Sequence, residues 1–292
     1  MLPEVIAVFG PTASGKSAVA ELLADRLGTG VISADALQVY RGLPVLTNQP
    51  ARSTRLVAIR EPSEEMSVGE YARLAHAAVD ELVAEHGSAV VAGGSGLYLR
   101  AALVDLALPP APANGARARW ETAYDADPRE AHAHLAELDP SAATLVHPND
   151  RRRVVRALEL AEVGASLVPA EDRLWSDDLR RPSLVVGLDV PLDELERRIR
   201  VRAEEMFGAG VVEEARSARA AGVSRTAEKA LGLREIAELP SDEAFERILV
   251  RTRRYAAYQR KWMRRIPGIV MIEADRPPDE VVDAILEVAR AR

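Results

Sequence analysis

The sequence predicts an α/β protein: a doubly wound parallel sheet with an inserted small all-helical domain. Two observations support this prediction. Short apolar runs alternate with helical patterns near both ends of the chain, as they do in parallel sheets covered by helices on both faces. The segment between these regions carries helical patterns only. A chain of 292 residues is long enough for one large domain or two smaller ones.

Five apolar runs are predicted to be strands, because each is short, rich in small or β-branched residues and bounded by turn residues. They are residues 5–9, 30–33, 89–92, 183–189 and 268–272. Apolar residues at helical spacing predict the helices of the core. These helices are residues 16–27, 68–85, 192–206, 211–221, 242–265 and 279–289.

A Pro- and Ala-rich stretch, LALPPAPANGARA at residues 106–118, marks a domain boundary, because proline removes a backbone donor and interrupts helices. Helical segments follow it at 128–138, 140–146 and 150–163, separated by DP and HPND turns. We therefore predict three parts: residues 1–112 as the first part of the core, 113–182 as a helical insert, and 183–292 as the second part, ending in a basic helical region.

The composition excludes several classes of protein. With 48% hydrophobic and 28% charged residues, the chain is typical of a globular protein, and no stretch has the 18 or more apolar residues of a spanning helix. The opening residues lack the basic head of a secretory leader, so we expect a cytoplasmic protein. Because there is no cysteine, disulfides, thiolate metal sites and cysteine nucleophiles are excluded. At a net charge of -7, any nucleic acid must be bound by local basic patches.

A glycine-rich loop follows the first predicted strand. Residues 10–17, GPTASGKS, match G-x-x-x-x-G-K-[ST] between a strand and a helix, which is the context of a P-loop. The loop amides and the helix N-terminus attract phosphates, Lys16 adds a positive charge, and the Ser17 hydroxyl can bind Mg²⁺. The sequence thus predicts a P-loop NTPase-like fold and a ligand with linked phosphates. The predicted phosphate-binding residues are Gly10, Thr12, Ala13, Ser14, Gly15, Lys16 and Ser17.

The parts used for nucleotide hydrolysis are not evident. The run at 89–92 continues into Gly93-Gly94-Ser95-Gly96 without the acid that a hydrolase would use for Mg²⁺. An acid does follow the earlier strand, at Asp35, and such strand ends border the ligand crevice of open α/β sheets. Asp35 is therefore the best-placed carboxylate of the chain.

At this point the chain resembles the tRNA dimethylallyltransferase family, also called tRNA isopentenyltransferase, over nearly its whole length. The resemblance rests on six blocks in order: G-P-T-A-S-G-K-S at 10–17, D-A-L-Q-V-Y-R-G at 35–42, G-G-S-G-L-Y at 93–98, H-P-N-D-x-x-R-x-x-R-A-L-E at 147–159, R-x-x-x-M at 202–206 and R-x-Y-A-x-x-Q-x-x-W at 253–262. It implies transfer of a dimethylallyl group from dimethylallyl diphosphate to N6 of the adenosine 3′ of the anticodon in tRNA. The implied partners are the anticodon stem-loop and this donor; we infer neither a membrane nor an obligate protein partner.

The chemistry that the resemblance implies agrees with the residues. A diphosphate leaving group suits a polyphosphate-binding loop, so no nucleotide needs to be hydrolysed. We assign Asp35 as the base that accepts a proton from the adenine amine. Gln38 can offer both a donor and an acceptor to the adenine edge. Because a stacked base cannot react, the adenosine must be extruded into a pocket.

Two further residues are expected at the diphosphate. Arg202 lies within the apolar helical face formed by Leu192, Leu195, Ile199 and Met206, and an inward-pointing arginine needs an anionic partner. The resemblance implies that Arg202 neutralises the departing diphosphate together with Lys16. It also implies that the Ser95 hydroxyl, where the family more often has threonine, donates to the diphosphate.

The segment RTRRYAAYQRKWMRR at 251–265 has seven basic residues and no acid. Its aromatic side chains at 255, 258 and 262 share one helical face, which we expect to be core rather than a platform for bases. The opposite, basic face is expected to bind RNA phosphates. The insert has a second basic patch on a helix capped by Asn149 or Asp150, and we expect the RNA to be clasped between the two patches. The expected RNA-binding residues are Arg153, Arg156, Arg253, Arg254, Arg260 and Lys261.

Several positions depart from the family pattern and leave the acceptor open. Ala36 replaces a serine, Gln49 replaces a lysine, residues 54–58 differ from a histidine-containing segment, and Ala257 and Tyr258 replace basic residues. A free adenine nucleotide, as in cytokinin-forming enzymes, is therefore a second acceptor compatible with the sequence. The glycine-rich loop is also compatible with an ATP-dependent small-molecule kinase, or with a non-catalytic RNA-binding protein that keeps a relict loop. The sequence does not determine which tRNAs are used, the donor chain length or the oligomeric state.

Overall fold

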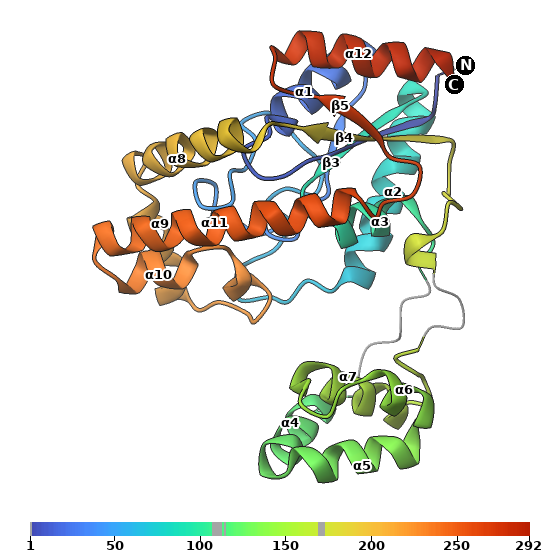
Figure 1. Cartoon of the computed structure of the whole chain (residues 1–292), viewed down its shortest axis with the longest axis vertical. Helices are drawn as coiled ribbons and strands as arrows, with labels where there is room; N and C mark the ends of the chain where they lie inside the picture. Colours follow the sequence, from blue (N-terminus) through green and yellow to red (C-terminus); the bar gives the residue numbers. More distant parts are fainter. Residues whose placement is uncertain (1, 107–112, 114, 169–172) are drawn as a thin grey trace. The chain divides into compact units, whose positions relative to one another are not determined.

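The computed structural model describes residues 2–106, 113, 115–168 and 173–292 and confirms the predicted α/β fold (Figure 1). Its sheet has five parallel strands in the order β2-β3-β1-β4-β5. The strands are β1 (Val5–Phe9), β2 (Val31–Ser33), β3 (Ala89–Gly93), β4 (Ser183–Asp189) and β5 (Val270–Glu273).

Helices cover both faces of this sheet. Figure 1 shows α1 (Lys16–Leu27) and α12 (Pro278–Ala291) on one face, and α2 (Val68–His86), α3 (Gly96–Leu103) and α11 (Ser241–Met263) on the other. The chain changes direction at β2, and right-handed crossovers then place α1 and α2 on opposite faces. Strands covered on both sides must be apolar throughout, which explains why every residue of β1 is buried.

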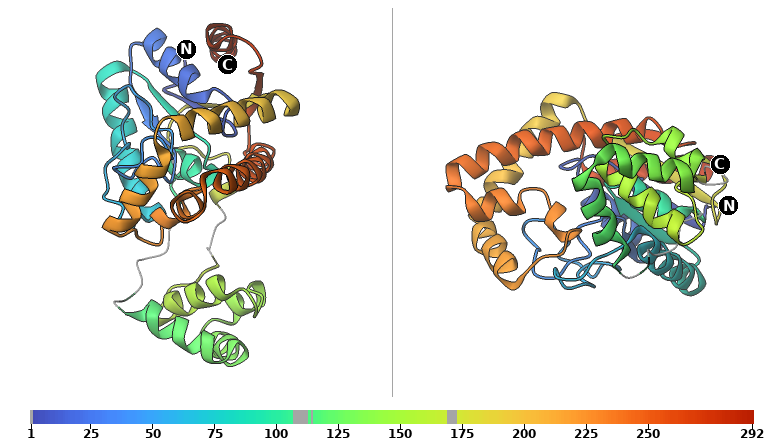
Figure 2. Two further views of the ribbon diagram at one scale, coloured as in Figure 1. Left: turned by 90° about the vertical axis from the view of Figure 1, so that its left-hand side faces the viewer. Right: turned by 90° about the horizontal axis from the view of Figure 1, so that it is seen from below.

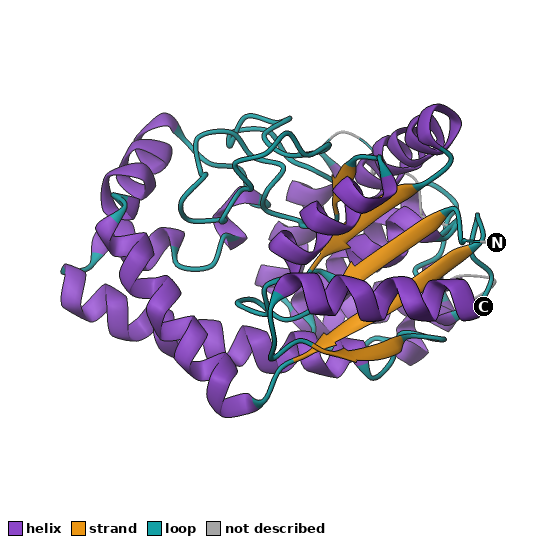
Figure 3. Ribbon diagram, turned by 90° about the horizontal axis from the view of Figure 1, so that it is seen from above, coloured by secondary structure: helices purple, strands orange, loops and turns teal. Residues whose placement is uncertain are grey.

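The order of the strands also indicates where a ligand can bind. β1 lies between β3 and β4 at the centre of the sheet, and the chain leaves it toward β2. Figure 3 shows the strands of this sheet lying between helices. The crevice at the carboxyl end of such a central strand is where open α/β sheets bind ligands. The loop between β1 and α1 occupies this place, and so do the segments that follow β2 and β3.

Three helices extend the core beyond the sheet (Figure 2): α8 (Leu192–Gly208), α9 (Val211–Ala221) and α10 (Leu233–Glu238). α8 and α10 pack on α11, and α9 packs on both α8 and α10. A single turn of 3₁₀ helix, Ala227–Lys229, precedes α10, and another, Arg173–Trp175, precedes β4. None of the helices described is long and apolar enough to cross a membrane.

Polar contacts fasten these helices to the segment that follows β2. The Glu214 carboxylate on α9 accepts the backbone N–H groups of Val45 at 2.9 Å and Leu46 at 2.7 Å. The Tyr40 hydroxyl donates to the Thr226 hydroxyl at 2.6 Å. Charge-assisted bonds to backbone amides are among the stronger hydrogen bonds in proteins, so this segment is held firmly on α9.

The second compact unit, residues 106–173, is the helical insert. It contains α4 (Ala116–Ala126), α5 (Pro128–Leu138), α6 (Pro140–Leu145) and α7 (Arg151–Glu162). Aspartates cap three of these helices, and Asp150, rather than Asn149, caps α7. The unit has an apolar core of its own, so it meets the requirement for folding as a separate domain.

The structure divides the chain at 105/106 and 173/174, whereas the sequence suggested 112/113 and 182/183. Residue 112 lies outside the described residues. At the second boundary, the buried Arg100 side chain donates from Nε to the Leu174 carbonyl at 2.7 Å and from Nη2 to the Ser176 carbonyl. These bonds attach residues 174–182 to the core, because a buried guanidinium without acceptors would be costly.

Candidate active site

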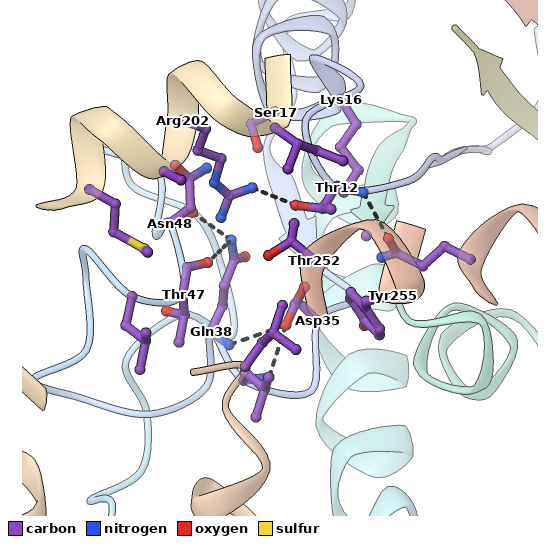
Figure 4. Close-up of a pocket in the computed structure, with 18 of the residues that line it drawn as sticks. Thr12, Lys16, Ser17, Asp35, Gln38, Thr47, Asn48, Arg202, Thr252 and Tyr255 are labelled. Atoms are coloured by element: carbon purple, nitrogen blue, oxygen red, sulfur yellow. Dashed lines mark hydrogen bonds between the residues drawn. The ribbon is translucent and has the colours of Figure 1, made fainter. Parts of the chain in front are cut away.

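A cavity of about 110 Å³ opens at the carboxyl end of the central strands, large enough for more than a single water molecule. Figure 4 shows side chains from four parts of the core converging on it. They come from the glycine-rich loop, the segment after β2, α8 and α11. The residues predicted for donor binding, proton transfer and adenine recognition that line it are Thr12, Lys16, Ser17, Asp35, Gln38 and Arg202.

The glycine-rich loop leaves the N-terminus of α1 open to a ligand. Gly15 is the N-cap with φ of 83°, a left-handed conformation that glycine adopts without strain. As a glycine, it offers no side-chain cap. The first hydrogen bond of the helix runs from the Val19 N–H to the Gly15 carbonyl at 3.2 Å. The first amides of α1 therefore have no partner within the helix and create a site for an anion.

Two cations lie at this anion site. The Lys16 ammonium donates to the Pro11 carbonyl at 3.2 Å, and Arg202 donates from Nη1 to the Thr12 hydroxyl at 2.7 Å. Burial lowers the pKa of Lys16 to about 8, although the Asp35 charge opposes the shift. Burial also lowers the pKa of Arg202. Two partly buried cations near one carboxylate leave an excess of positive charge, which a bound polyanion would neutralise.

Asp35 follows β2 and presents one oxygen to the cavity. Its Oδ1 atom accepts the N–H groups of Leu37 at 2.9 Å and Gln38 at 3.4 Å. Among the residues that the structure describes, Oδ2 accepts no hydrogen bond. Since the backbone fixes the carboxylate through one oxygen, the other is held ready for a proton donor bound in the cavity.

Two predicted residues are placed differently from expectation. The Gln38 amide lines the cavity, but it is already engaged: Oε1 accepts from the Ser33 hydroxyl at 2.7 Å, and Nε2 donates to the Asn48 carbonyl at 2.7 Å. Ser95 is the N-cap of α3 and is not among the residues that line the cavity. The predicted contact between the Ser95 hydroxyl and the diphosphate therefore stays a prediction, although Gly94 beside it lies against the loop, where an added Cβ would come within 3.1 Å of the Gly10 carbonyl oxygen.

Sequence reasoning missed Gln259, which is 2% exposed on α11. Its Oε1 accepts the Thr12 N–H at 2.8 Å, and its Nε2 donates to the Gly94 carbonyl at 2.8 Å. One amide thus joins the glycine-rich loop to the end of β3. One signal could have identified it. Gln259 is a neutral polar residue in a basic helix and lies at helical spacing from Thr252 and Tyr255, so these residues share the face of α11 that forms the cavity wall.

The Thr12 amide also differs from the prediction. Since its N–H donates to Gln259 and its hydroxyl accepts from Arg202, Thr12 orients the surrounding side chains in this conformation and has no free amide for a phosphate. The Ser14 N–H is also engaged, since it donates to the Pro11 carbonyl at 3.2 Å. The anion site is therefore left to the remaining amides of the loop and of the first turn of α1, and to Lys16.

An apolar wall faces the charged side of the cavity. Ile199, Ala203 and Met206 of α8 contribute to it, together with Leu231 and Ile248. Arg202 emerges from the same helix between these residues, as the sequence predicted, although Leu192 at the start of the helix is 62% exposed. A ligand with a charged end and a small hydrocarbon end matches this division.

The basic helix α11 is only partly as expected. The Arg254 and Lys261 side chains are exposed, but Arg260 turns inward and donates to the Val190 carbonyl at 3.1 Å and to Asp189 at 3.4 Å. Arg253 is half-buried. The expectation of an aromatic core face is wrong for Tyr258, which is 55% exposed, because α11 packs through Ala256, Gln259 and Met263 instead.

Within the insert, the two predicted RNA-binding arginines differ. Arg153 is 67% exposed. Arg156 is partly buried, and its Nη1 donates to the Glu159 carboxylate at 3.0 Å. Arg117 binds the same carboxylate, which is fully buried. Arg156 therefore helps to hold the insert together, since a buried glutamate requires compensating positive charge.

Comparisons with known proteins identify the family of this chain. A family model described as IPP transferase matches residues 38–266. The tRNA dimethylallyltransferase of Anaeromyxobacter dehalogenans (strain 2CP-C) is 40% identical over 291 residues, covering 94% of this chain and 96% of its own. That of Streptomyces coelicolor is 39% identical over 281 residues, covering 91% of this chain and 89% of its own.

Solved structures share the fold of this chain. The tRNA isopentenylpyrophosphate transferase from Bacillus halodurans has a TM-score of 0.70 at 28% identity, with 99% of this chain and 96% of that chain covered. A eukaryotic dimethylallyltransferase acting on tRNA shares the fold, with a TM-score of 0.79 at 22% identity over 99% of this chain and 80% of that one. The family-model match and the 40% identity over nearly the full length together establish that this chain belongs to the IPP transferase family.

Proposed function

We propose that this chain transfers a dimethylallyl group from dimethylallyl diphosphate to N6 of the adenosine 3′ of the anticodon in tRNA, releasing diphosphate. The observation that carries the proposal is the convergence of Lys16, Arg202 and Asp35 on one cavity at the N-terminus of α1. The activity in the names of the relatives, tRNA dimethylallyltransferase, supports it.

The division of the cavity into a charged side and an apolar wall favours one orientation of the donor. Its diphosphate would bind the open amides of α1, with Lys16 and Arg202 neutralising its charge. Its five-carbon group would lie against the apolar wall formed by residues of α8 and Ile248. Binding an anion would favour the charged form of Lys16, whose pKa burial has lowered to about 8.

The transfer needs one proton acceptor and a stabilised leaving group. The bond between C1 of the dimethylallyl group and the diphosphate oxygen breaks, and a bond forms between C1 and the adenine N6. Asp35 accepts the proton that N6 releases, through the Oδ2 atom that the backbone leaves open. Lys16 and Arg202 stabilise the charge that develops on the diphosphate.

The residues around the loop also fit a magnesium ion. Mg²⁺ binds hard oxygen ligands, retains water molecules and takes its other ligands from substrate phosphates. Ser17 at the start of α1 offers a hydroxyl to the same cavity as Asp35, so Ser17 would hold the ion beside the diphosphate. When bound, Mg²⁺ supplies further positive charge to the leaving group.

A tRNA acceptor is favoured over a free nucleotide. The exposed cations Arg254 and Lys261 on α11, and Arg153 in the insert, would serve RNA phosphates and would have no role with a small acceptor. The extruded adenosine would enter beside Asp35. Because its substrate is tRNA, we further propose that the enzyme acts in the cytoplasm.

Mass spectrometry of the products tests this function. Dimethylallyl diphosphate is offered with unmodified tRNA in one reaction and with adenosine monophosphate in another. We expect the added mass of one dimethylallyl group on adenosine from the tRNA digest. Product from the free nucleotide alone would show the cytokinin-type activity, and phosphate transfer from ATP would show a kinase; either result would overturn the proposal.

A further inference from the structure

Tyr258 is an exposed aromatic residue that the reaction does not use. Its side chain is 55% exposed on α11, one helical turn beyond Tyr255, which lines the cavity. At 1.5 Å of rise per residue, the two positions are about 4.5 Å apart along the helix axis. Residues three apart are neighbours on a helix surface, so Tyr258 lies beside the part of the cavity wall that Tyr255 forms.

Other aromatic rings support Tyr258 from behind. Its ring meets that of Trp262 edge to face, with 6.5 Å between centroids. Trp262 in turn packs against Trp175, with centroids 4.9 Å apart and the planes inclined by 36°. A Cβ atom on Gly96 would come within 2.2 Å of the Trp262 ring, so only glycine leaves room for the indole there. This packing immobilises Trp262 and leaves Tyr258 at the surface.

The cations around these rings are available to phosphates. Arg254 lies four residues before Tyr258 and Lys261 three residues after it, so both are its neighbours on the helix surface. Arg265 stands over Trp175, with its guanidinium carbon 4.1 Å from the ring centroid. Within the described ranges, none of these three cations forms an ion pair with a carboxylate. Aromatic faces beside unpaired cations are the combination that binds single-stranded nucleic acid.

We propose that Tyr258, supported by Trp262, is a stacking platform for the unpaired RNA base next to the adenosine that is modified. The inference rests on the proposed function, since it takes that adenosine to be the base in the cavity. Arg254 and Lys261 bind the phosphates on either side of the stacked base. Stacking on an aromatic side chain is independent of base identity, and its loss weakens binding by a factor of about 5 to 150 per base.

Binding of an anticodon stem-loop RNA to the full-length protein tests the platform. We expect Tyr258→Ala to raise the dissociation constant about tenfold, which is within the range for the loss of one stacking contact. Tyr258→Phe should bind as the unchanged protein does, because the ring is retained. Val250→Ala, which shortens another exposed apolar side chain of α11, is the matched control and should leave the affinity unchanged.

RNAs that lack one base identify the contact. Two stem-loops carry an abasic nucleotide, one on the 5′ side and one on the 3′ side of the target adenosine. With one of these RNAs, Tyr258→Ala should have no further effect, because the base that it contacts is already missing. The platform is refuted if Tyr258→Ala binds the intact stem-loop as tightly as the unchanged protein does. It is also refuted if the substitution lowers the affinity by the same factor for all three RNAs.

Product formation separates this inference from the proposed function. If the unchanged protein modifies tRNA and Tyr258→Ala retains full affinity, only the platform is wrong. If the unchanged protein forms no dimethylallyl product with any RNA, the proposed function itself is wrong.

Discussion

The lowered pKa of Lys16 predicts that donor affinity depends on pH. Burial lowers this pKa to about 8 in the free protein, and only the charged ammonium attracts the diphosphate. Below pH 8 Lys16 is already protonated, so affinity is nearly constant. Above pH 8 most of Lys16 is neutral and must take up a proton before it can attract the diphosphate. The dissociation constant for dimethylallyl diphosphate should therefore rise about tenfold between pH 7 and pH 9.

Calorimetry without RNA measures this dependence, and Lys16→Arg supplies the control. The guanidinium remains charged throughout this range, so the variant should show only whatever titration belongs to the ligand. The ratio of the two dissociation constants therefore isolates Lys16. If the affinity of the unchanged protein were as insensitive to pH as that of Lys16→Arg, the reasoning from burial would be refuted.

The same shift predicts an effect on folding in the absence of ligand. The pKa of Lys16 falls from 10.5 to about 8 on folding, so between these values the unfolded chain binds more protons than the folded one. Stability should therefore rise with pH through this window. Relative to Lys16→Met, the unchanged protein should gain about 3 kcal/mol across it, measured by urea denaturation.

Three further predictions concern other residues. Asp35→Asn should lower kcat at least about a hundredfold and leave the donor dissociation constant within about twofold; a normal kcat would remove Asp35 from proton transfer. Gln259→Leu leaves the Thr12 amide and the Gly94 carbonyl without the Gln259 side chain as partner. It should lower the free energy of unfolding by about 1–3 kcal/mol and raise the KM for the donor. An unchanged melting temperature together with an unchanged KM would contradict the role of Gln259. Glu159→Ala removes the buried carboxylate that Arg117 and Arg156 bind and should destabilise the insert by about 3–5 kcal/mol. Hydrogen exchange should then show that the amides of the insert lose their protection earlier than in the unchanged protein. Equal protection in the two proteins would argue against the buried ion pairs.

Local patterns were sufficient to predict much of the core. The strand at Val5–Phe9 and the helix at Lys16–Leu27 begin and end where the sequence suggested, because the intervening loop has a characteristic spacing and the flanking runs have clear periods. Helix α3 was missed, since eight residues directly after a glycine-rich turn give no periodic signal. Helix α4 was missed because it starts inside the Pro- and Ala-rich stretch that was expected to interrupt helices.

The placement of the site residues was harder to predict, because it depends on partners distant in sequence. Gln259 contacts a residue 247 positions away, and Arg202 contacts one 190 positions away. Periodicity indicated that Arg202 points inward, but not that Arg260 does, since its acceptors lie at the end of β4. The exposure of Tyr258 depends on how α11 lies against α3, which no pattern within the helix specifies.

The most direct test is a crystal structure of this protein with a thiodiphosphate analogue of the donor. We predict that the diphosphate binds the first amides of α1, within hydrogen-bond distance of Lys16 and Arg202, with the five-carbon group against Ile199 and Met206 and the open oxygen of Asp35 facing C1. A diphosphate bound away from Lys16, or an Asp35 carboxylate turned out of the cavity, would contradict the proposed chemistry.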